Sequence, residues 1–580
     1  MSQNSYGPRT QAADSLHAMK YRNPNEDFRE AMNRVAFGLK DSDEHYHALR
    51  GILLDQRFCP GGRIQGAIGS SRATTAYNCF VSGTIEDSFV EGAGSIMGRA
   101  KDAAATMRMG GGIGYDFSTL RPRGDLIRKL YSQSSGPISF MHIYNAVCLA
   151  TASSGHRRGA QMGILRVDHP DVEEFIRAKQ NATDLTGFNI SLAITDQFME
   201  AVAAGREFDL TFAGRTYSTV DAQELWEKIM RSTWDYAEPG VIFIDTINRM
   251  NNLWYCETIA ATNPCGEQPL PPFGACLLGS FNLTKYLRSR PMAVGEAPWY
   301  FDFDQLMDDI PHVIRGMDNV IDRTKYPLAE QKAEALSKRR MGLGVMGLAN
   351  AGEACGHAYG SAGFLNFQRK VLSVINTEAY RHSALLAREK GSFPLFDTER
   401  YLQGKFIKTL PDEIRHMILN GGMRNSHLTS IAPTGTISMC ADNVSGGVEP
   451  VFSYELTRQI NTPAGPALAT VQDYGVAYLG TRGKLAASVT AKEHVSVLAL
   501  AQEFVDSAVS KTVNMTGAMP WADFKDIYFR AWGLGCKGCA TFNSDGKRMA
   551  LLMPTKADEP DSEGVLCHVP DPATGQVECG

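Results

Sequence analysis

Residues 262–282 have the sequence TNPCGEQPLPPFGACLLGSFN. Proline and glycine are so frequent here that we expect a loop and not a core helix. Cys265 lies in this stretch, with Asn263 two residues before it and Glu267 two residues after it, and Cys276 follows eleven residues later. Two thiols, an amide and a carboxylate in one rigid segment indicate a reactive site.

Several kinds of chemistry fit Cys265. The nucleophile of an acyl transfer needs a nearby imidazole base, and the sequence does not show which of the 13 His residues is close. Glu267 could act instead as a general base, and Asn263 can both donate and accept hydrogen bonds. With Cys79, in the short stretch NCFV, and Cys276, the set holds three thiols. One thiol could start a reaction while the other two supply a pair of electrons by forming a disulfide.

The composition is that of an ordinary globular protein. The chain has 580 residues, of which 43% are apolar and 21% charged, and its net charge is −5. We expect one large domain with appendages, or several domains, and no binding to nucleic acid or membrane. The N-terminus lacks an apolar signal core, and no apolar run approaches the roughly 20 residues of a membrane helix. A cytoplasmic protein is the expectation.

Strands and helices are expected to alternate through most of the chain, which favours an α/β architecture. Apolar spacing predicts mostly helical segments at 26–57, 88–108, 339–352 and 364–390. Aromatic and β-branched content predicts strands within 75–84, 240–248 and 428–438, the last running into a turn. After about residue 536 the chain becomes polar with Pro and Gly, which predicts a mobile tail.

Two glycine-containing motifs could bind phosphate. GLGVMG, at 342–347, fits a dinucleotide-binding pattern, but it lacks a preceding strand signal and a following acidic residue, so the match is weak. APTGTIS, at 432–438, supplies three hydroxyls and successive backbone N–H groups that can surround an anion. A plain connection with a Thr or Ser helix cap explains the second motif equally well.

Twelve cysteines in a chain of this length do not indicate a disulfide scaffold. Cys536 and Cys539 form a C-x-x-C motif without a partner motif for zinc, which leaves a redox pair or two isolated thiols. Cys567 and Cys579 lie on the predicted tail and could exchange with a buried disulfide, or they could be incidental exposed thiols. We interpret the remaining thiols in apolar or mixed surroundings as small core residues: Cys148, Cys256, Cys355 and Cys440.

The motifs together resemble ribonucleotide reductases, in particular the adenosylcobalamin-dependent class II enzymes. The similarity runs from about residue 25 to about residue 550 and rests on specific stretches in the expected order: PGGRIQGAIG, NCFV, GGGIGYDFSTLRPRG, SSGPISFM, RRGAQMGIL, NPCGEQPL, RRMGLGVMGLA, SIAPTGTIS and GVEPVF. The resemblance implies a ten-stranded α/β barrel of two five-stranded parallel halves around a central finger loop. It places a helical segment at 1–75, the barrel at 76–535 and a Cys-containing tail at 536–580.

The resemblance also implies a role for each residue of the opening stretch. Cys265 becomes a thiyl radical that removes the 3′-hydrogen of the ribose. Glu267 takes the proton of the 3′-hydroxyl, and Asn263 holds the sugar hydroxyls. Cys79 and Cys276 deliver the reducing equivalents as the 2′-hydroxyl leaves as water.

Two binding sites follow from the same resemblance. The substrate-binding residues would be Asn78, Gly112, Pro433, Thr434, Gly435, Thr436, Ile437 and Ser438. A dNTP effector that controls specificity would bind at Asp87, Ser88, Arg121 and the loop 124–135, with Arg157 or Arg158 reaching toward the substrate base. Apart from the resemblance, these arginines could be ordinary surface residues.

The resemblance favours a cobalamin enzyme over its relatives. Class I subunits carry a tandem Tyr pair that relays a radical from a partner subunit, whereas the corresponding positions here are Ala540 and Thr541. We therefore expect adenosylcobalamin as the cofactor; a class I-type subunit and a zinc-binding scaffold protein remain the alternatives. The expected partners are a ribonucleotide, a dNTP effector, a thioredoxin- or glutaredoxin-like reductant acting through Cys567 and Cys579, and a second copy in a homodimer. Control through an N-terminal ATP cone is not expected.

Overall fold

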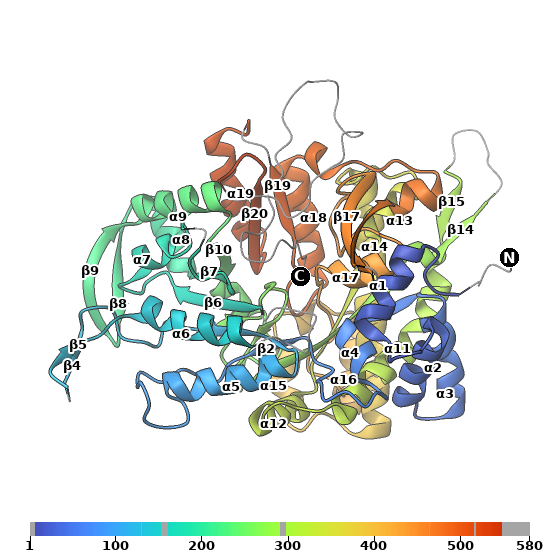
Figure 1. Ribbon diagram of the computed structural model, residues 1–580, viewed down its shortest axis with the longest axis horizontal. Helices are drawn as coiled ribbons and strands as arrows, with labels where there is room; N and C mark the ends of the chain where they lie inside the picture. Colours follow the sequence, from blue (N-terminus) through green and yellow to red (C-terminus); the bar gives the residue numbers. More distant parts are fainter. Residues whose placement is uncertain are drawn as a thin grey trace.

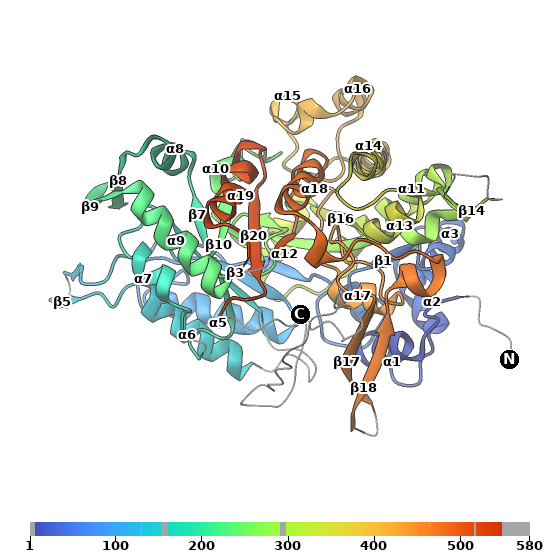
Figure 2. The ribbon, with the colours of Figure 1, turned by 90° about the horizontal axis from the view of Figure 1, so that it is seen from above.

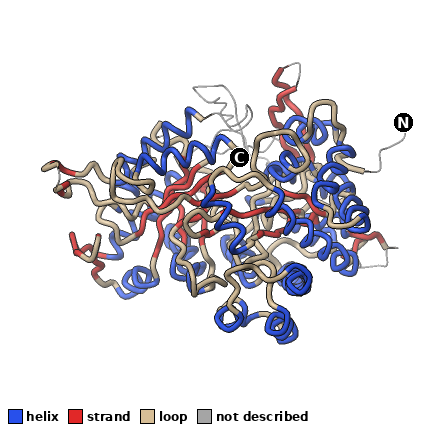
Figure 3. The backbone as a smooth tube through the Cα atoms, turned by 90° about the horizontal axis from the view of Figure 1, so that it is seen from below, coloured by secondary structure: helices blue, strands red, loops and turns tan. Residues whose placement is uncertain are grey.

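The computed structural model describes residues 6–128, 130–151, 160–181, 183–290, 297–462, 465–515 and 518–547. A ten-stranded mixed sheet forms the centre of the molecule. Figure 3 shows the strands gathered toward the middle with helices around them. In Figure 1, the small β-hairpins β4–β5 and β8–β9 lie at one end of the molecule and the N-terminal helices lie at the other.

Five neighbouring strands of the sheet are parallel. Helices connect them, because parallel neighbours need a crossover and cannot be joined by a tight turn. The strands are β2 (Cys79–Val81), β3 (Gly112–Asp116), β6 (Gln161–Arg166), β7 (Phe188–Ile194) and β10 (Gly240–Phe243). The connecting helices are α5 (Ile96–Arg108), α6 (Pro137–Ala150), α7 (Val172–Arg177), α8 (Asp196–Ala204) and α9 (Ala222–Tyr236).

The other strands flank this parallel group on both sides. On one side β13 (Ala275–Asn282) pairs antiparallel with β2 and β1 (Phe58–Pro60) and parallel with β16 (Met341–Met346). On the other side β20 (Gly538–Asn543) pairs antiparallel with β10 and parallel with β19 (Thr512–Met515). Isolated parallel bridges join Leu343 to Thr429 and Ile431 to Val509, so the segment 429–431 lies between β16 and the approach to β19.

Further helices pack around these strands. At the N-terminus they are α1 (Gln11–Tyr21), α2 (Phe28–Leu39), α3 (Asp43–Leu54) and α4 (Gly62–Ala67). The remaining helices are α10 (Ile244–Arg249), α11 (Phe303–Arg323), α12 (Ala329–Lys338), α13 (Leu348–Ala354), α14 (Ala362–Lys390), α15 (Thr398–Gln403), α16 (Asp412–Gly421), α17 (Gly435–Cys440), α18 (Ala491–Glu503) and α19 (Trp521–Gly533).

Short hairpins complete the fold. They are β4 (Leu126–Ile127) with β5 (Ser132–Gln133), β8 (Glu207–Phe212) with β9 (Arg215–Asp221), β11 (Ala261–Thr262) with β12 (Pro269–Leu270), β14 (Leu287–Ser289) with β15 (Trp299–Phe301), and β17 (Glu455–Thr462) with β18 (Gly465–Gln472). Figure 2 shows that β17 and β18 project from the body of the molecule. Among the helices within the described ranges, none is both long and apolar enough to pass through a bilayer.

The two faces of the parallel strands pack against different partners. Alternate residues such as Ile190 and Leu192 of β7 join the large core beneath the helices, whereas Ala193 joins a second, smaller apolar cluster. That small cluster also takes residues from β2, β6, β10 and β13, and it includes Ile259, Ala261 and Leu270 from the segment around β11 and β12. Because successive side chains of a strand point to opposite faces, the β11–β12 hairpin lies on the face turned away from the helices.

The expected helices are shorter in the structure because capping residues interrupt them. Asp27 and Ser42 accept hydrogen bonds at the starts of α2 and α3, so the segment 26–57 forms two helices. Ser95 caps α5, which therefore begins at residue 96 and not at 88. The helix expected at 364–390 is confirmed by α14.

Two expectations about secondary structure are wrong. Residues 341–346 form the fully buried strand β16, followed by α13, and not a continuous helix. Residues 538–543, expected to lie in the tail, form β20 inside the sheet. Both are apolar runs whose period does not distinguish a buried strand from other buried structure.

Candidate active site

Cys265 lies at the tip of the hairpin formed by β11 and β12. Thr262 pairs with Pro269, and the Asn263 N–H donates to the Gln268 carbonyl at 3.1 Å. The chain then turns through Gly266, whose φ of 81° is in the region that favours glycine. The hairpin therefore carries the thiol at its end.

Glycines of β3 allow this hairpin to approach the sheet. A Cβ atom built on Gly114 would lie 1.7 Å from the Thr262 carbonyl oxygen, and one on Gly112 would lie 3.1 Å from a Pro264 ring carbon. From β7, Asn189 Nδ2 donates to the Pro264 carbonyl at 3.1 Å. The position of the tip is thus determined by two neighbouring elements of the parallel group.

Asn263, Cys79 and Glu267 meet behind the tip. Asn263 Nδ2 lies 3.1 Å from Cys79 Sγ, and the Cys79 thiol lies 3.9 Å from Glu267 Oε1. The Gln268 N–H donates to Asn263 Oδ1 at 2.9 Å, which fixes the orientation of the amide. Asn263 and Glu267 are each 1% exposed and Cys79 is 6% exposed. The site thus excludes water from its carboxylate and from one thiol.

Glu267 is also anchored by two segments outside the parallel group of strands. Its carbonyl accepts hydrogen bonds from Ser430 Oγ and from the Ala508 N–H, both at 3.0 Å. Ser430 belongs to the extended segment that bridges β16 and the approach to β19. The hairpin is therefore held both by the parallel group of strands, through Asn189, and by the segments that contain Ser430 and Ala508.

The backbone brings Cys79 and Cys276 opposite each other. They are paired residues of the antiparallel strands β2 and β13. Directly opposed residues in such a pair have Cα atoms about 4.5–5.5 Å apart, within the range that a disulfide spans. The side chain of Cys276 lies outside what the structure describes.

Cys265 differs from its neighbours in being exposed. A Cβ atom built on the adjacent Gly266 would meet no atom within 4 Å among the described residues. Asn263, Pro264 and Glu267 are buried. The tip thus carries an exposed cysteine, while the groups behind it are enclosed.

The segment 433–438 begins a short helix. Thr434 has a φ of 56° and precedes α17, and its Oγ1 accepts a hydrogen bond from the Gly447 N–H at 3.0 Å. Thr434 does not cap α17 with its side chain, so the plain cap expected as an alternative is wrong for this residue. The first N–H groups of a helix have no partner within it and point toward any bound anion.

Asn78 and Gly112 adjoin the site. Asn78 Oδ1 is buried and has no hydrogen-bond partner among the described residues. The Gly112 N–H donates to the Asn78 carbonyl at 3.0 Å, which joins β3 to the segment that leads into Cys79. An acceptor enclosed in this way indicates a site for a donor group.

The residues of the expected effector site are only partly described. Arg121 Nε donates to Asp87 Oδ2 at 2.7 Å, and its Nη1 donates to the Leu126 carbonyl at 3.0 Å. The Ser88 hydroxyl accepts from the Glu91 N–H at 3.2 Å. Asp87 and Arg121 thus connect the loop before α5 to the β4–β5 hairpin. Arg157 and Arg158 lie outside the described residues.

The other cysteines separate into distinct environments. Cys536 and Cys539 are buried, and burial raises the pKa of Cys539 to about 12 and that of Cys536 further. This disfavours the expectation that they form a rival redox pair, because the reactive species is the thiolate. Within the described part of the chain no group of His, Cys, Asp and Glu could hold a metal. Cys567 and Cys579 lie outside the described residues.

Among the four thiols expected in the core, Cys148 and Cys440 are buried and Cys355 is half-buried. Cys256 is exposed, so that expectation is wrong for this residue. It belongs to the irregular segment that follows α10, where the chain turns before it enters the hairpin.

Comparison with known proteins identifies the family. The model of the ribonucleotide reductase barrel domain matches residues 77–542. The chain belongs to the ribonucleotide reductase family. A vitamin B12-dependent ribonucleoside-diphosphate reductase of Mycobacterium tuberculosis (strain CDC 1551 / Oshkosh) is 34% identical over 512 residues, covering 83% of this chain and 69% of the relative.

Two further relatives of this ribonucleotide reductase carry related names. The vitamin B12-dependent ribonucleoside-diphosphate reductase of Thermoplasma acidophilum is 34% identical, covering 80% of this chain and 62% of the relative. The vitamin B12-dependent ribonucleotide reductase of Streptomyces clavuligerus is 27% identical, covering 93% of this chain and 64% of the relative. The family resemblance inferred from the motifs is therefore confirmed.

Some residues of the site were not predicted from the sequence. They are Asn189, Gln268, Ser430 and Ala508, which orient the hairpin by hydrogen bonds. Asn189 had a detectable signal, because it is a polar residue alternating with the buried residues of β7. Ser430 and Ala508 contact Glu267 from remote segments and carry no such signal.

Proposed function

We propose that this ribonucleotide reductase converts ribonucleoside diphosphates to 2′-deoxyribonucleoside diphosphates with adenosylcobalamin as its cofactor. The observation that carries the proposal is the hairpin that presents Cys265 at an exposed tip above the buried cluster of Asn263, Cys79 and Glu267. The names of the relatives support the choice of cofactor and substrate.

The surroundings of Cys265 fit the cofactor. Cys265 is exposed, and a Cβ atom built on Gly266 would meet no atom within 4 Å among the described residues. When bound, adenosylcobalamin supplies a carbon–cobalt bond whose homolysis starts radical chemistry. Such a cofactor could approach Cys265 without disturbing the buried cluster of Asn263, Cys79 and Glu267.

Each residue of the site has its own role in the proposed reaction. As a thiyl radical, Cys265 takes the 3′-hydrogen atom of the ribose, and Glu267 accepts the proton of the 3′-hydroxyl. The 2′-hydroxyl leaves as water with a proton from one thiol of the pair Cys79 and Cys276, and the other thiol gives a hydrogen atom to C2′. The two sulfurs join in a disulfide, and the electron that this releases, with the proton held by Glu267, restores the 3′-hydroxyl. Cys265 then returns its hydrogen atom to C3′ and is again a thiyl radical.

The geometry supports these assignments. The 3.9 Å contact between the Cys79 thiol and Glu267 Oε1 gives proton transfer a short path. The register of β2 and β13 needs no rearrangement of the backbone for a disulfide. Asn263, oriented by the Gln268 N–H, places its amide N–H group beside Cys79 Sγ, where it could also donate to a sugar hydroxyl.

The remaining binding assignments belong to the same proposal. Pro433, Thr434, Gly435, Thr436, Ile437 and Ser438 hold the substrate phosphates at the start of α17, and Asn78 and Gly112 hold the nucleoside. A dNTP binds at Asp87, Ser88 and Arg121, with Arg157 or Arg158 reaching toward the substrate base.

A homodimer belongs to the same proposal. Exposed apolar residues in the nearby segments, including Phe89, Met97 and Leu126, are suitable for an interface between two copies of the chain.

We also propose a barrel of two five-stranded parallel halves, formed by the strands of the sheet other than the antiparallel β1 together with the segment 429–431. The parallel group from β2 to β10 is one half. The bridges from β16 through the segment 429–431 to Val509 support closure of the second half. A closed arrangement would surround the hairpin and exclude water from the radical.

Peptide mapping after a single turnover without reductant tests the reaction. We expect Cys79 and Cys276 to be linked in the wild-type protein and to be free in protein incubated without substrate. Two free thiols after measured product formation would contradict the assignment of Cys79 and Cys276 as the source of the two electrons.

A class I-type mechanism is the second candidate function. Thr541 stands at one of the positions where class I subunits carry the Tyr pair, and its Oγ1 lies 2.8 Å from the hydroxyl of the buried Tyr528. One tyrosine therefore does lie at this place.

A further inference from the structure

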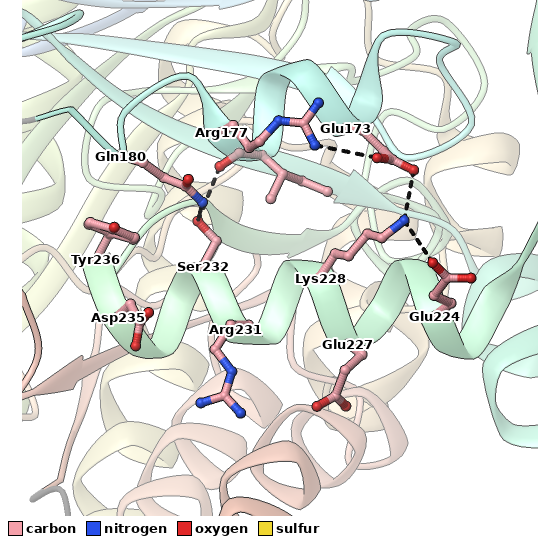
Figure 4. Close-up of a pocket in the computed structure, with 11 residues that line it drawn as sticks. Glu173, Arg177, Gln180, Glu224, Glu227, Lys228, Arg231, Ser232, Asp235 and Tyr236 are labelled. Atoms are coloured by element: carbon pink, nitrogen blue, oxygen red, sulfur yellow. Dashed lines mark hydrogen bonds and ion pairs between the residues drawn. The ribbon is translucent and has the colours of Figure 1, made fainter.

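A groove between α7 and α9 lies away from the site described above. Its volume is about 390 Å³. Figure 4 shows α9 along one wall, with α7 and the residues that follow it along the other. The groove runs lengthwise along α9, from Glu224 near the start of that helix to Tyr236 at its end.

The charged groups at one end of the groove pair with each other. Lys228 Nζ lies 3.0 Å from both Glu173 Oε1 and Glu224 Oε1, and Arg177 lies 3.4 Å from Glu173. Ile176 and the aliphatic stems of these side chains supply apolar surface between the walls. A partner for this groove therefore needs apolar side chains and not additional charge.

The last described residue stands at the opposite end. The Lys547 N–H donates to the Asp235 carbonyl at 2.6 Å, and Lys547 Nζ lies 2.9 Å from Asp235 Oδ2. The same ammonium lies 5.1 Å from the centre of the Tyr236 ring. Asp235 and Tyr236 both line the groove. The chain thus leaves the described fold at the mouth of the groove.

The sequence that follows Lys547 has the required character. Residues 548–553 have the sequence RMALLM and precede Pro554, whereas the residues after Pro554 are mostly polar, with Pro and Gly. Six extended residues cover about 20 Å, and the part of α9 from 224 to 236 is about 18 Å long. The length of the apolar segment therefore matches the length of the groove.

We propose that residues 548–553 of this chain dock in the groove between α7 and α9 and run antiparallel to α9. Docking would place the apolar side chains of Met549, Leu551, Leu552 and Met553 against the surface around Ile176. The inference goes beyond the proposed function, since it assigns a binding surface that takes no part in the reaction.

The docked segment would act as the fixed base of the thiol-bearing tail. Cys567 lies fourteen residues beyond Met553 and could reach about 46 Å from it when extended. Without docking, the fixed base of the tail would be Lys547, and Cys567 could reach a larger volume around the molecule. Docking thus limits where Cys567 and Cys579 can travel.

Limited trypsin digestion of the full chain tests docking. Cleavage after Lys547 or Arg548 should be at least about tenfold slower than cleavage after Lys556, because a docked segment must first open. The double variant Leu551→Asp/Leu552→Asp should remove this protection and leave the Lys556 rate unchanged. The matched control Val565→Asp/Leu566→Asp changes an apolar pair later in the tail and should keep the protection. Equal rates in wild type and in the first variant would overturn the proposal.

A photo-crosslinking amino acid at Leu552 in the full chain identifies the occupant without any assay of activity. We expect crosslinks to peptides containing 173–180 or 224–236 of the same chain. Crosslinks between two chains, detected by mass, would assign the groove to a second copy and overturn the proposal. Crosslinks spread over unrelated surfaces would overturn it as well. Failure of either test leaves the proposed reaction untouched.

Discussion

At the scale of the residue, the site separates an exposed thiol from a buried acid–thiol cluster. Cys265 is exposed, whereas Glu267 and Asn263 are each 1% exposed a few atoms away. This arrangement suits the proposed roles, in which Cys265 meets the cofactor and Glu267 accepts a proton away from water. The sequence predicted these residue types from their spacing, but the hydrogen bonds that orient them come from Asn189, Ser430 and Ala508, which are remote in the chain.

Replacing the tip thiol tests its role. We expect Cys265→Ser to abolish reduction, because an O–H bond is much stronger than an S–H bond and serine cannot easily become the hydrogen-abstracting radical. The hydroxyl nearly matches the thiol in size, so folding and nucleotide affinity should be retained. Turnover and equilibrium binding of the nucleotide are the measurements. Cys256→Ser is the matched control, since that cysteine is also exposed but lies outside the site; substantial reduction by Cys265→Ser would refute the assignment.

Glu353 in α13 predicts a pH dependence of stability. Burial raises its pKa from 4.5 to about 7, although the Lys484 and Tyr359 N–H groups donate to its Oε1. Between these pH values the folded state binds more protons than the unfolded state, so the free energy of unfolding falls as pH rises. This loss is about 3 kcal/mol. Glu353→Gln should therefore show a smaller decrease in stability between pH 4.5 and pH 8.

Denaturant unfolding at several pH values measures this effect. Glu330→Gln is the control, because Glu330 is exposed on α12. Its curve should follow that of the wild type. Parallel curves for the wild type and Glu353→Gln would show that Glu353 does not titrate in this window.

At the scale of the element, the alternation of strands and helices was predictable and several boundaries were not. The aromatic and β-branched run at Cys79 correctly indicated β2. β16 was missed because Gly342 and Gly344 replace the bulky residues that usually mark a strand. They do so because the backbone and side chain of Ser430 approach them: a Cβ atom on Gly344 would lie 2.4 Å from the Ser430 carbonyl oxygen. Such a contact between remote segments leaves no local pattern.

The close contact between β3 and the hairpin gives a prediction about Gly114. Gly114→Ala would place a Cβ atom 1.7 Å from the Thr262 carbonyl oxygen, and backbone must move to accept it. We expect the tip to shift, with turnover reduced at least tenfold and the free energy of unfolding lowered by about 1–3 kcal/mol. Kinetics and thermal unfolding of the variant check this.

Gly533→Ala provides the comparison for that variant. A Cβ atom built there meets nothing among the described residues, and the position ends α19, away from the hairpin. Both turnover and stability should be retained, because alanine is the better helix former. Normal turnover by Gly114→Ala would show that the hairpin is not held against β3 as the structure indicates.

At the scale of the whole molecule, segments that are far apart in the sequence meet at the centre of the fold. β20 joins the sheet, and the segment 429–431 forms isolated bridges to Leu343 and Val509; neither composition nor periodicity could show these contacts between remote segments. The motif order did predict the family, because each short stretch carries chemistry and their order is improbable by chance.

The proposed role of Cys567 and Cys579 gives a prediction for the C-terminal residues. Deleting residues 560–580 should abolish turnover with a thioredoxin-type reductant and spare turnover with a small dithiol.

That deletion separates delivery of electrons from the reaction itself. We expect a small dithiol to diffuse to Cys79 and Cys276, whereas a protein reductant is too large to reach the buried Cys79. The ratio of the two rates is the measurement, with Val577→Ala in the full chain as a control that keeps both tail thiols. Equal loss with both reductants would indicate that the tail has a structural role.

The central claim is that this chain alone, with adenosylcobalamin, reduces ribonucleotides. The most direct measurement is the rate of deoxyribonucleotide formation by the purified chain with a small dithiol, with and without adenosylcobalamin. We expect product only when the cofactor is added, because positions 540 and 541 are Ala and Thr and not a tandem Tyr pair. Product formed without cobalamin after addition of a metal-containing partner subunit would contradict the claim.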